Sequence, residues 1–120
     1  MEEIVSMDNR GCMIKYTFGK KVFWFAYTNQ GCARGGEFHP VTQYVVVIDG
    51  SLLFKMMKEN GEEQRQVDKG DIIIIPANIP HVAIALANTI SIEWHDGELP
   101  PFEQKNIYEP YRRIVRKNDK

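Results

Sequence analysis

The chain has few cysteines and no long hydrophobic run. Cys12 and Cys32 are the two cysteines among 120 residues. They are too few for a disulfide framework, so we expect two reduced thiols in a cytoplasmic protein. The longest apolar runs, such as residues 72–77, are far too short to span a bilayer. The first residues also lack the basic and apolar segments of a signal peptide, so a secreted or membrane-spanning protein is not expected.

The sequence also lacks an excess of charge of either sign. Its 15 Lys and Arg residues nearly balance its 16 Asp and Glu residues, which gives a formal net charge of −1. The basic residues are scattered, apart from a group near the C-terminus that is more typical of a solvated helix face than of a binding patch. Nucleic-acid and membrane-surface partners are not predicted, because both depend on concentrated positive charge.

Short apolar or alternating runs separated by turn residues fill most of the chain, which is typical of all-β proteins. The expected strands cover residues 12–18, 22–27, 37–48 (broken near Pro40, which cannot donate to a ladder), 51–58, 63–67, 72–75, 81–86 and 90–94. The four isoleucines at 72–75 predict a strand that is covered on both faces. Pro110 predicts the first turn of a short closing helix that runs to about Lys117. These elements predict a single domain over residues 1–120, closed as a barrel or sandwich.

Polar residues of one expected strand form the first part of a candidate site. Side chains alternate across a strand, so the even spacing of Glu37, His39 and Gln43 predicts that they face the same side, provided that the strand keeps its register. His81 begins a later expected strand. Two imidazoles, a carboxylate and an amide oxygen that converge inside a barrel would suit a divalent transition metal.

The spacing of these residues resembles the first sequence motif of the cupin family, G-x5-H-x-H-x3-E-x6-G. Residues 31–50 have this spacing, and His39 falls on the second His. Glu37 stands in the place of the first His, and Gln43 stands in the place of the Glu.

The second cupin motif, G-x5-P-x-G-x2-H-x3-N, has the spacing of residues 70–81. Pro76 and His81 fall in register, while Asn78 replaces a turn Gly and Ala85 replaces the closing Asn. The two motifs together imply an all-β, cupin-type double-stranded β-helix, or jelly-roll barrel, with a short C-terminal helix.

Cupins that bind a metal typically use three His and one Glu. The resemblance therefore implies a metal site at Glu37, His39, Gln43 and His81, with Zn, Mn, Fe or Ni as candidate ions, since carboxylate and amide oxygens are both acceptable ligands. Such an ion would act as a Lewis acid on a small polar or carbohydrate-like substrate, in an isomerase or oxygenase reaction. Glu37 would be either a ligand or a proton carrier.

A second and shorter resemblance is to the nucleotide-sugar 3,4-ketoisomerases, which are cupins that work without a metal. Arg34, His39 and Gln43 match the pattern of those enzymes, and Glu37 replaces a His thought to move protons. This resemblance implies no cofactor and a sugar or sugar-nucleotide ligand. Glu37 or His39 would be the catalytic residue that abstracts a proton next to a carbonyl, and Arg34 would bind a diphosphate.

A third alternative is a non-catalytic barrel that binds a small molecule. The residues that we expect to bind the ligand are Arg34, Gln43 and Tyr27. Single cupin domains commonly form homodimers, and the aromatic segment 22–27 is a candidate contact between two copies.

Overall fold

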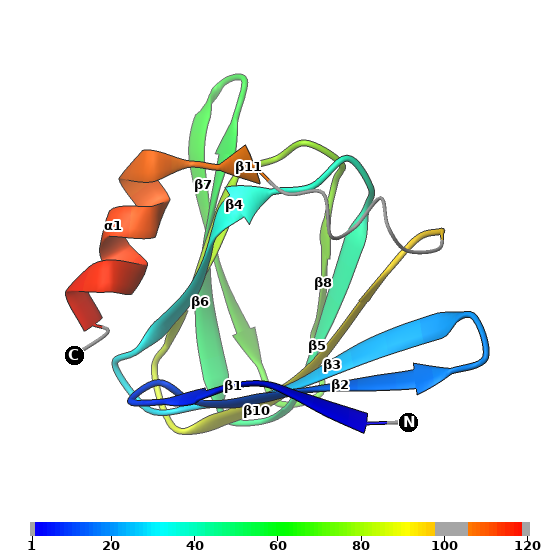
Figure 1. Cartoon of the computed structure of the whole chain (residues 1–120). Coiled ribbons are helices and arrows are strands. Elements are labelled where there is room, and N and C mark those ends of the chain that lie inside the picture. The colour runs from blue at the N-terminus through cyan, green and yellow to red at the C-terminus, as the bar shows by residue number, and fades with distance from the viewer. Residues whose placement is uncertain (1, 98–105, 119–120) are drawn as a thin grey trace.

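The computed structural model describes residues 2–97 and 106–118, which form two antiparallel sheets that face each other (Figure 1). The larger sheet has six strands. In spatial order they are β1 (Glu2–Asp8), β2 (Gly11–Phe18), β3 (Lys21–Thr28), β10 (Thr89–His95), β5 (Gln43–Asp49) and β8 (Ile72–Ile75). Strand β1 was not expected from the sequence, because its apolar residues are interrupted and its side chains are mostly exposed.

The second sheet has five strands. In spatial order they are β11 (Asn106–Ile107), β4 (Ala33–Phe38), β9 (His81–Ala85), β6 (Ser51–Lys58) and β7 (Gly61–Asp68). Helix α1 (Glu109–Asn118) lies on the outer side of this sheet, where Tyr111 and Val115 pack against Ala33 and Val82 (Figure 1). The predicted all-β architecture with a short C-terminal helix is confirmed.

The core lies between the two sheets. Burial alternates along β5 and β6, so that Val45 and Val47 from one sheet meet Leu52, Phe54 and Met56 from the other. Within residues 2–97 and 106–118, no helix has the length and apolar character that crossing a bilayer requires.

The prediction that all four isoleucines of β8 are covered on both faces is wrong. Ile73 and Ile75 are buried in the core, but Ile72 and Ile74 are 46% and 53% exposed. Strand β8 is at the edge of the six-stranded sheet, and only its inner face meets the core.

The prediction that Glu37, His39 and Gln43 share one strand is also wrong. Strand β4 ends at Phe38 in the five-stranded sheet, and β5 begins at Gln43 in the six-stranded sheet. The chain crosses between the sheets at Pro40, which cannot donate to a strand ladder. His39 lies in this crossing, and its carbonyl accepts a 2.7 Å hydrogen bond from the backbone of Asn78.

Candidate functional site

A cavity of about 410 Å³ lies between the two sheets, beside the apolar core. Its floor includes core side chains such as Val45, Leu52 and Phe54. Its charged and strongly polar lining includes Lys15, Arg34, Glu37, His39, Gln43, His81 and Glu93. A concave space of this volume, with a few convergent polar groups, is typical of a small-molecule site.

The cavity brings together all but one of the residues that we predicted for the site. Tyr27 is the exception: its side chain is 40% exposed, whereas its neighbours on β3, Ala26 and Thr28, line the cavity. Side chains alternate along a strand, so Tyr27 must face outward. Its expected role as a ligand-binding side chain is corrected, and its backbone carbonyl instead accepts a 3.0 Å hydrogen bond from Arg34.

Glu37 is held between His39 and the C-terminal helix. His39 Nε2 lies 3.4 Å from Glu37 Oε1, and Arg112 Nη2 donates to Glu37 Oε2 at 3.1 Å. Gly36 permits this arrangement, because a Cβ atom at that position would lie 2.6 Å from the Cα atom of Arg112. Strand β4 and helix α1 therefore approach closely, and both oxygens of the Glu37 carboxylate face a nitrogen atom.

His81 is buried at the cavity wall with a defined ring orientation. Its Nδ1 atom lies 3.0 Å from the carbonyl oxygen of Ile79. A carbonyl only accepts hydrogen bonds, so Nδ1 carries the hydrogen and Nε2 presents a lone pair. Burial lowers the pKa of His81 and favours the neutral ring. The ring centroids of His81 and His39 are 5.6 Å apart.

Glu93 is a site residue that the sequence analysis missed. It lies on β10, and its Oε2 atom accepts a 2.7 Å hydrogen bond from Nε2 of Gln43. Burial, together with the negative charge of Glu37, raises the pKa of Glu93 to about 7. The alternation of Ser91 and Glu93 with apolar residues in β10 was an available signal, because it places both polar side chains on one face.

Gln43 joins Glu93 through its nitrogen and leaves its amide oxygen available in the cavity wall. The side chain is buried, and its Oε1 atom has no hydrogen-bond partner among the described residues. Buried polar atoms are normally satisfied, so this oxygen marks a position for a ligand donor or a cation.

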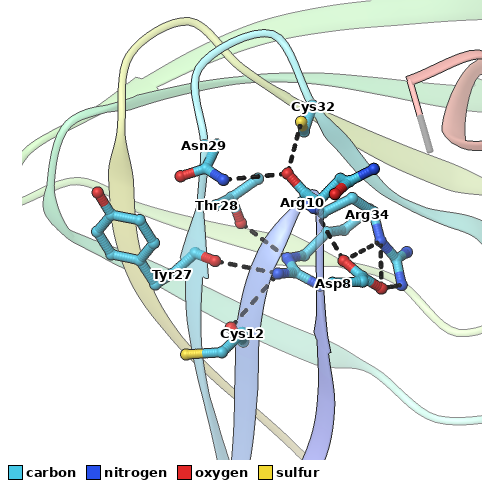
Figure 2. Close-up of polar contacts among 9 residues, drawn as sticks. Asp8, Arg10, Cys12, Tyr27, Thr28, Asn29, Cys32 and Arg34 are labelled. Atoms are coloured by element: carbon cyan, nitrogen blue, oxygen red, sulfur yellow. Dashed lines mark hydrogen bonds and ion pairs between the residues drawn. The ribbon is translucent and has the colours of Figure 1, made fainter. Parts of the chain in front are cut away.

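Arg34 lies at one end of the cavity, fixed by three hydrogen bonds (Figure 2). Its Nε atom donates to Thr28 Oγ1 at 2.8 Å, and its Nη2 atom donates to the carbonyls of Tyr27 and Cys12 at 3.0 and 3.3 Å. These acceptors come from β2 and β3, whereas Arg34 belongs to β4. The Arg34 side chain therefore joins the two sheets, and its own positive charge lies at the cavity wall.

A second, smaller cavity of about 190 Å³ adjoins the first, since both are lined by Arg34, Gly35 and Glu37. Arg10 and Arg112 also line the smaller cavity. Three guanidinium groups thus surround one end of the combined space, although Arg10 also pairs with Asp8 and Arg112 with Glu37.

The donor set fits a metal ion only in part. Among the described residues, no group of three or more His, Cys, Asp or Glu side chains is arranged to hold one. The two oxygens of Glu37 already face nitrogen atoms of His39 and Arg112. His39, His81 and the amide oxygen of Gln43 remain as donors that could bind an ion.

Comparison with known proteins identifies the family. The family model described as Cupin matches residues 15–97, which is more than half of the chain. The chain belongs to the cupin family. No curated protein matches it.

Solved structures confirm the fold. The capsular polysaccharide assembling protein CapF from Staphylococcus aureus superposes with a TM-score of 0.73 and 18% sequence identity, over 89% of this chain and 32% of CapF. Oxalate decarboxylase from Bacillus subtilis, described for its Mn(II) centres, superposes with a TM-score of 0.77 and 17% identity, over 88% of this chain and 30% of that protein. The cupin chain thus spans about a third of these relatives.

Proposed function

We propose that the cavity binds a small anionic molecule of the carbohydrate class and exchanges a proton with it. The contact of 3.4 Å between Glu37 and His39 carries this proposal. A carboxylate beside an imidazole, both at the wall of one cavity and mostly shielded from solvent, is an arrangement suited to general acid–base chemistry.

The proposed reaction is the isomerisation of a keto sugar. The Glu37 carboxylate takes a proton from the carbon next to the carbonyl, and the C–H electron pair forms a C=C bond. The carbonyl π electrons move to oxygen, which takes a proton from the imidazole of His39 and gives an enediol. His39 then takes the proton of the other hydroxyl while Glu37 returns its proton to the former carbonyl carbon, so the carbonyl moves by one position, both side chains are restored, and no outside oxidant or reductant is needed.

The arginine-lined end of the cavity supports an anionic ligand. Arg34, Arg10 and Arg112 surround the smaller cavity, and guanidinium groups bind phosphate and carboxylate oxygens in pairs. The resemblance of residues 31–47 to nucleotide-sugar ketoisomerases supports a sugar nucleotide as the ligand. The fold likeness to a capsular polysaccharide assembling protein is compatible with the same class.

Binding of sugar nucleotides tests the proposal. Thermal unfolding is followed in EDTA with nucleoside-diphosphate sugars, and with the same sugars lacking the diphosphate. Stabilisation by the first set alone supports the proposal, since a ligand that binds only the folded state raises its stability. No shift with either set contradicts it, and binding of a keto-sugar nucleotide without turnover would favour the non-catalytic alternative.

A second candidate function is binding of a divalent transition metal. Two observations favour it. The Nε2 atom of His81 has a lone pair that can bind a metal, since Nδ1 carries the hydrogen. Gln43 Oε1 is buried and has no hydrogen-bond partner among the described residues. His39, His81 and Gln43 would hold the ion, and Glu37 would join them on releasing Arg112. The ion would polarise a bound carbonyl or hydroxyl group. Elemental analysis of untagged protein for Zn, Mn, Fe and Ni tests this, and less than a tenth of an equivalent would contradict it.

The proposed setting is a cytoplasmic one, as expected from the thiols. We also propose that two copies of the chain associate, with the aromatic segment 22–27 of β3 as the expected contact.

A further inference from the structure

We infer that Arg112 exchanges Glu37 for an oxyanion when that anion enters the smaller cavity, and that this exchange releases the Glu37 carboxylate for proton transfer. Arg112 is then a positioning residue, because it acts on the reacting carbon of the ligand only through Glu37. This role rests on the proposed function, in which Glu37 takes a proton from a sugar that carries an anionic group. It links the anionic end of the ligand to the chemistry at the other end.

The carboxylate of Glu37 lies at the junction of the two cavities and lines both of them. Its Oε1 atom is 3.4 Å from Nε2 of His39, which lines the larger cavity. Its Oε2 atom accepts the 3.1 Å hydrogen bond from Arg112, which lines the smaller cavity. One carboxylate therefore contacts a group from each cavity, and a change of partner in the smaller cavity acts directly on the proposed base.

The smaller cavity has the charge and the size of a site for one anionic group. Its lining includes three guanidinium groups, from Arg10, Arg34 and Arg112, against the single carboxylate of Glu37 among the described residues. Its volume of about 190 Å³ is below the roughly 300–1,000 Å³ of sites that hold a whole ligand. Because guanidinium groups bind phosphate oxygens in pairs, a diphosphate fits this cavity and leaves the larger one for the sugar.

Of the three guanidinium groups, that of Arg112 is held least firmly. Arg34 donates three hydrogen bonds across the two sheets, and Arg10 donates three to the carboxylate of Asp8 (Figure 2). The side chain of Arg112 donates one hydrogen bond to a described residue, and its Nε atom is buried without a partner among those residues. Buried polar atoms are normally satisfied, so a second position, in which more of its N–H groups meet an oxyanion, competes with the observed one.

The backbone of helix α1 is fixed independently of the Arg112 side chain. The neighbouring Tyr111 is buried, and its hydroxyl donates a 2.8 Å hydrogen bond to Glu62 on β7. The backbone of Arg112 itself lies against Gly36, where there is no room for a Cβ atom. We therefore expect the movement to be confined to the Arg112 side chain, which is 22% exposed.

A ligand without its anionic group meets a Glu37 carboxylate that is still paired with Arg112. With the anion in place, Arg112 turns to the anion and Oε2 of Glu37 becomes available to the carbon next to the carbonyl. Binding energy from a remote part of the ligand is thus used to assemble the reacting groups. An inorganic oxyanion that is supplied separately should have the same effect on a keto sugar that lacks the diphosphate.

Activation by inorganic pyrophosphate tests this role of Arg112. Exchange of the hydrogen next to the carbonyl is followed in D₂O with EDTA, on a neutral keto sugar with and without pyrophosphate and on the intact nucleoside-diphosphate keto sugar. In wild type, pyrophosphate should raise the rate with the neutral sugar by at least about 10-fold, as expected for a hydrogen bond to a charged group. Arg112→Ala should abolish this activation without lowering the rate with the neutral sugar alone, a combination that a purely structural role would not produce.

Two further variants serve as controls. Arg113→Ala should keep the full activation, because Arg113 is exposed on the same helix and lines neither cavity. Arg112→Lys should keep part of it, because lysine supplies the charge but not the planar fork of donors. The lysine variant takes the place of Arg112→Ala if circular dichroism shows that the alanine variant does not fold.

Calorimetric binding of pyrophosphate separates the failure of this role from the failure of the proposed function. Arg112→Ala should weaken binding by at least about 10-fold, and Arg113→Ala should leave it unchanged, whether or not any sugar reacts. Equal binding by these two variants would overturn the role of Arg112. Full activation in Arg112→Ala, or wild type that exchanges the intact substrate but is not activated by pyrophosphate, would also overturn it. Binding that depends on Arg112 without exchange on any sugar would instead support the anion site and overturn the proposed reaction.

Discussion

Arg112 in helix α1 donates a 3.1 Å hydrogen bond to Glu37 at the end of strand β4, 75 positions earlier in the chain. The C-terminal helix therefore does more than cover the five-stranded sheet, because it holds the carboxylate that we propose as the proton carrier. The same contact turns both oxygens of Glu37 toward nitrogen atoms. The position of the helix and the chemistry of the cavity are thus linked.

Gly36 is the position at which this link can be broken. It has a φ angle of +80°, and a Cβ atom there would lie 2.6 and 2.7 Å from Cα and N of Arg112. We expect Gly36→Ala to lower the free energy of unfolding by about 3 kcal/mol, because backbone strain and a steric clash both act. Urea denaturation measures this loss, and hydrogen exchange should show faster exchange in α1.

Gly70→Ala is the matched control for this experiment. Gly70 also has a positive φ angle, +89°, but nothing lies within 4 Å of its Cβ position. Its substitution should cost only about 1 kcal/mol of backbone strain. If Gly36→Ala and Gly70→Ala lowered the free energy of unfolding equally, the close approach of β4 and α1 at Gly36 would be contradicted.

Glu93 should make the stability of the protein depend on pH. Its pKa is about 7 in the folded protein, against an ordinary value of 4.5. Between these values the folded state binds more protons than the unfolded state, so stability falls as pH rises through this window. Above pH 7, this pKa shift lowers the free energy of unfolding by about 3 kcal/mol at most, relative to its value at low pH.

The variant Glu93→Gln should remove this dependence, and its introduced amide oxygen can still accept the hydrogen bond from Gln43. Urea denaturation at pH 5, 6, 7 and 8 should give similar stabilities near pH 5 and a more stable variant at pH 8. His81 has a lowered pKa, so its contribution falls as pH drops below its ordinary value of 6.5. The His81 contribution is the same in wild type and in Glu93→Gln. If the free energies of unfolding of the two proteins change in parallel with pH, the raised pKa of Glu93 is refuted.

Arg34 should stabilise the contact between the two sheets through its three hydrogen bonds as well as through its charge. Lysine cannot reach Thr28, Tyr27 and Cys12 together, so Arg34→Lys should lower the free energy of unfolding by about 2 kcal/mol. Thr28→Val removes one of the three acceptors and should cost about 1 kcal/mol. A double-mutant cycle checks the coupling, and fully additive losses would show that the Arg34–Thr28 bond contributes nothing.

The sequence predicted the fold from local signals. Turn residues and alternating runs located most of the described strands, and Pro110 located the helix, because each of these features acts over a few neighbouring residues. They missed β1, β11 and β4, whose glycines are typical of a loop. The isoleucines of β8 could not be assigned correctly from local signals, because a continuous apolar run does not reveal that its strand lies at the edge of a sheet.

The candidate site was predictable where a motif fixed its spacing and not where a contact joined distant segments. His39 and His81 fall in register with two motifs and line one cavity. Arg112 and Glu93 reach the site from α1 and β10, and no local pattern encodes their pairing with Glu37 and Gln43. Tyr27 was misplaced because an aromatic run such as residues 22–27 does not reveal which face of its strand meets the cavity.

Exchange of a carbon-bound hydrogen with solvent tests the central claim most directly. Protein treated with EDTA is incubated in D₂O with a nucleoside-diphosphate keto sugar, and deuterium on the carbon next to the carbonyl is followed by NMR. We predict incorporation with wild type and a loss of at least about 100-fold in rate for Glu37→Gln, in line with general base catalysis. No incorporation by wild type, incorporation that requires added metal, or an unchanged rate in Glu37→Gln would contradict the account.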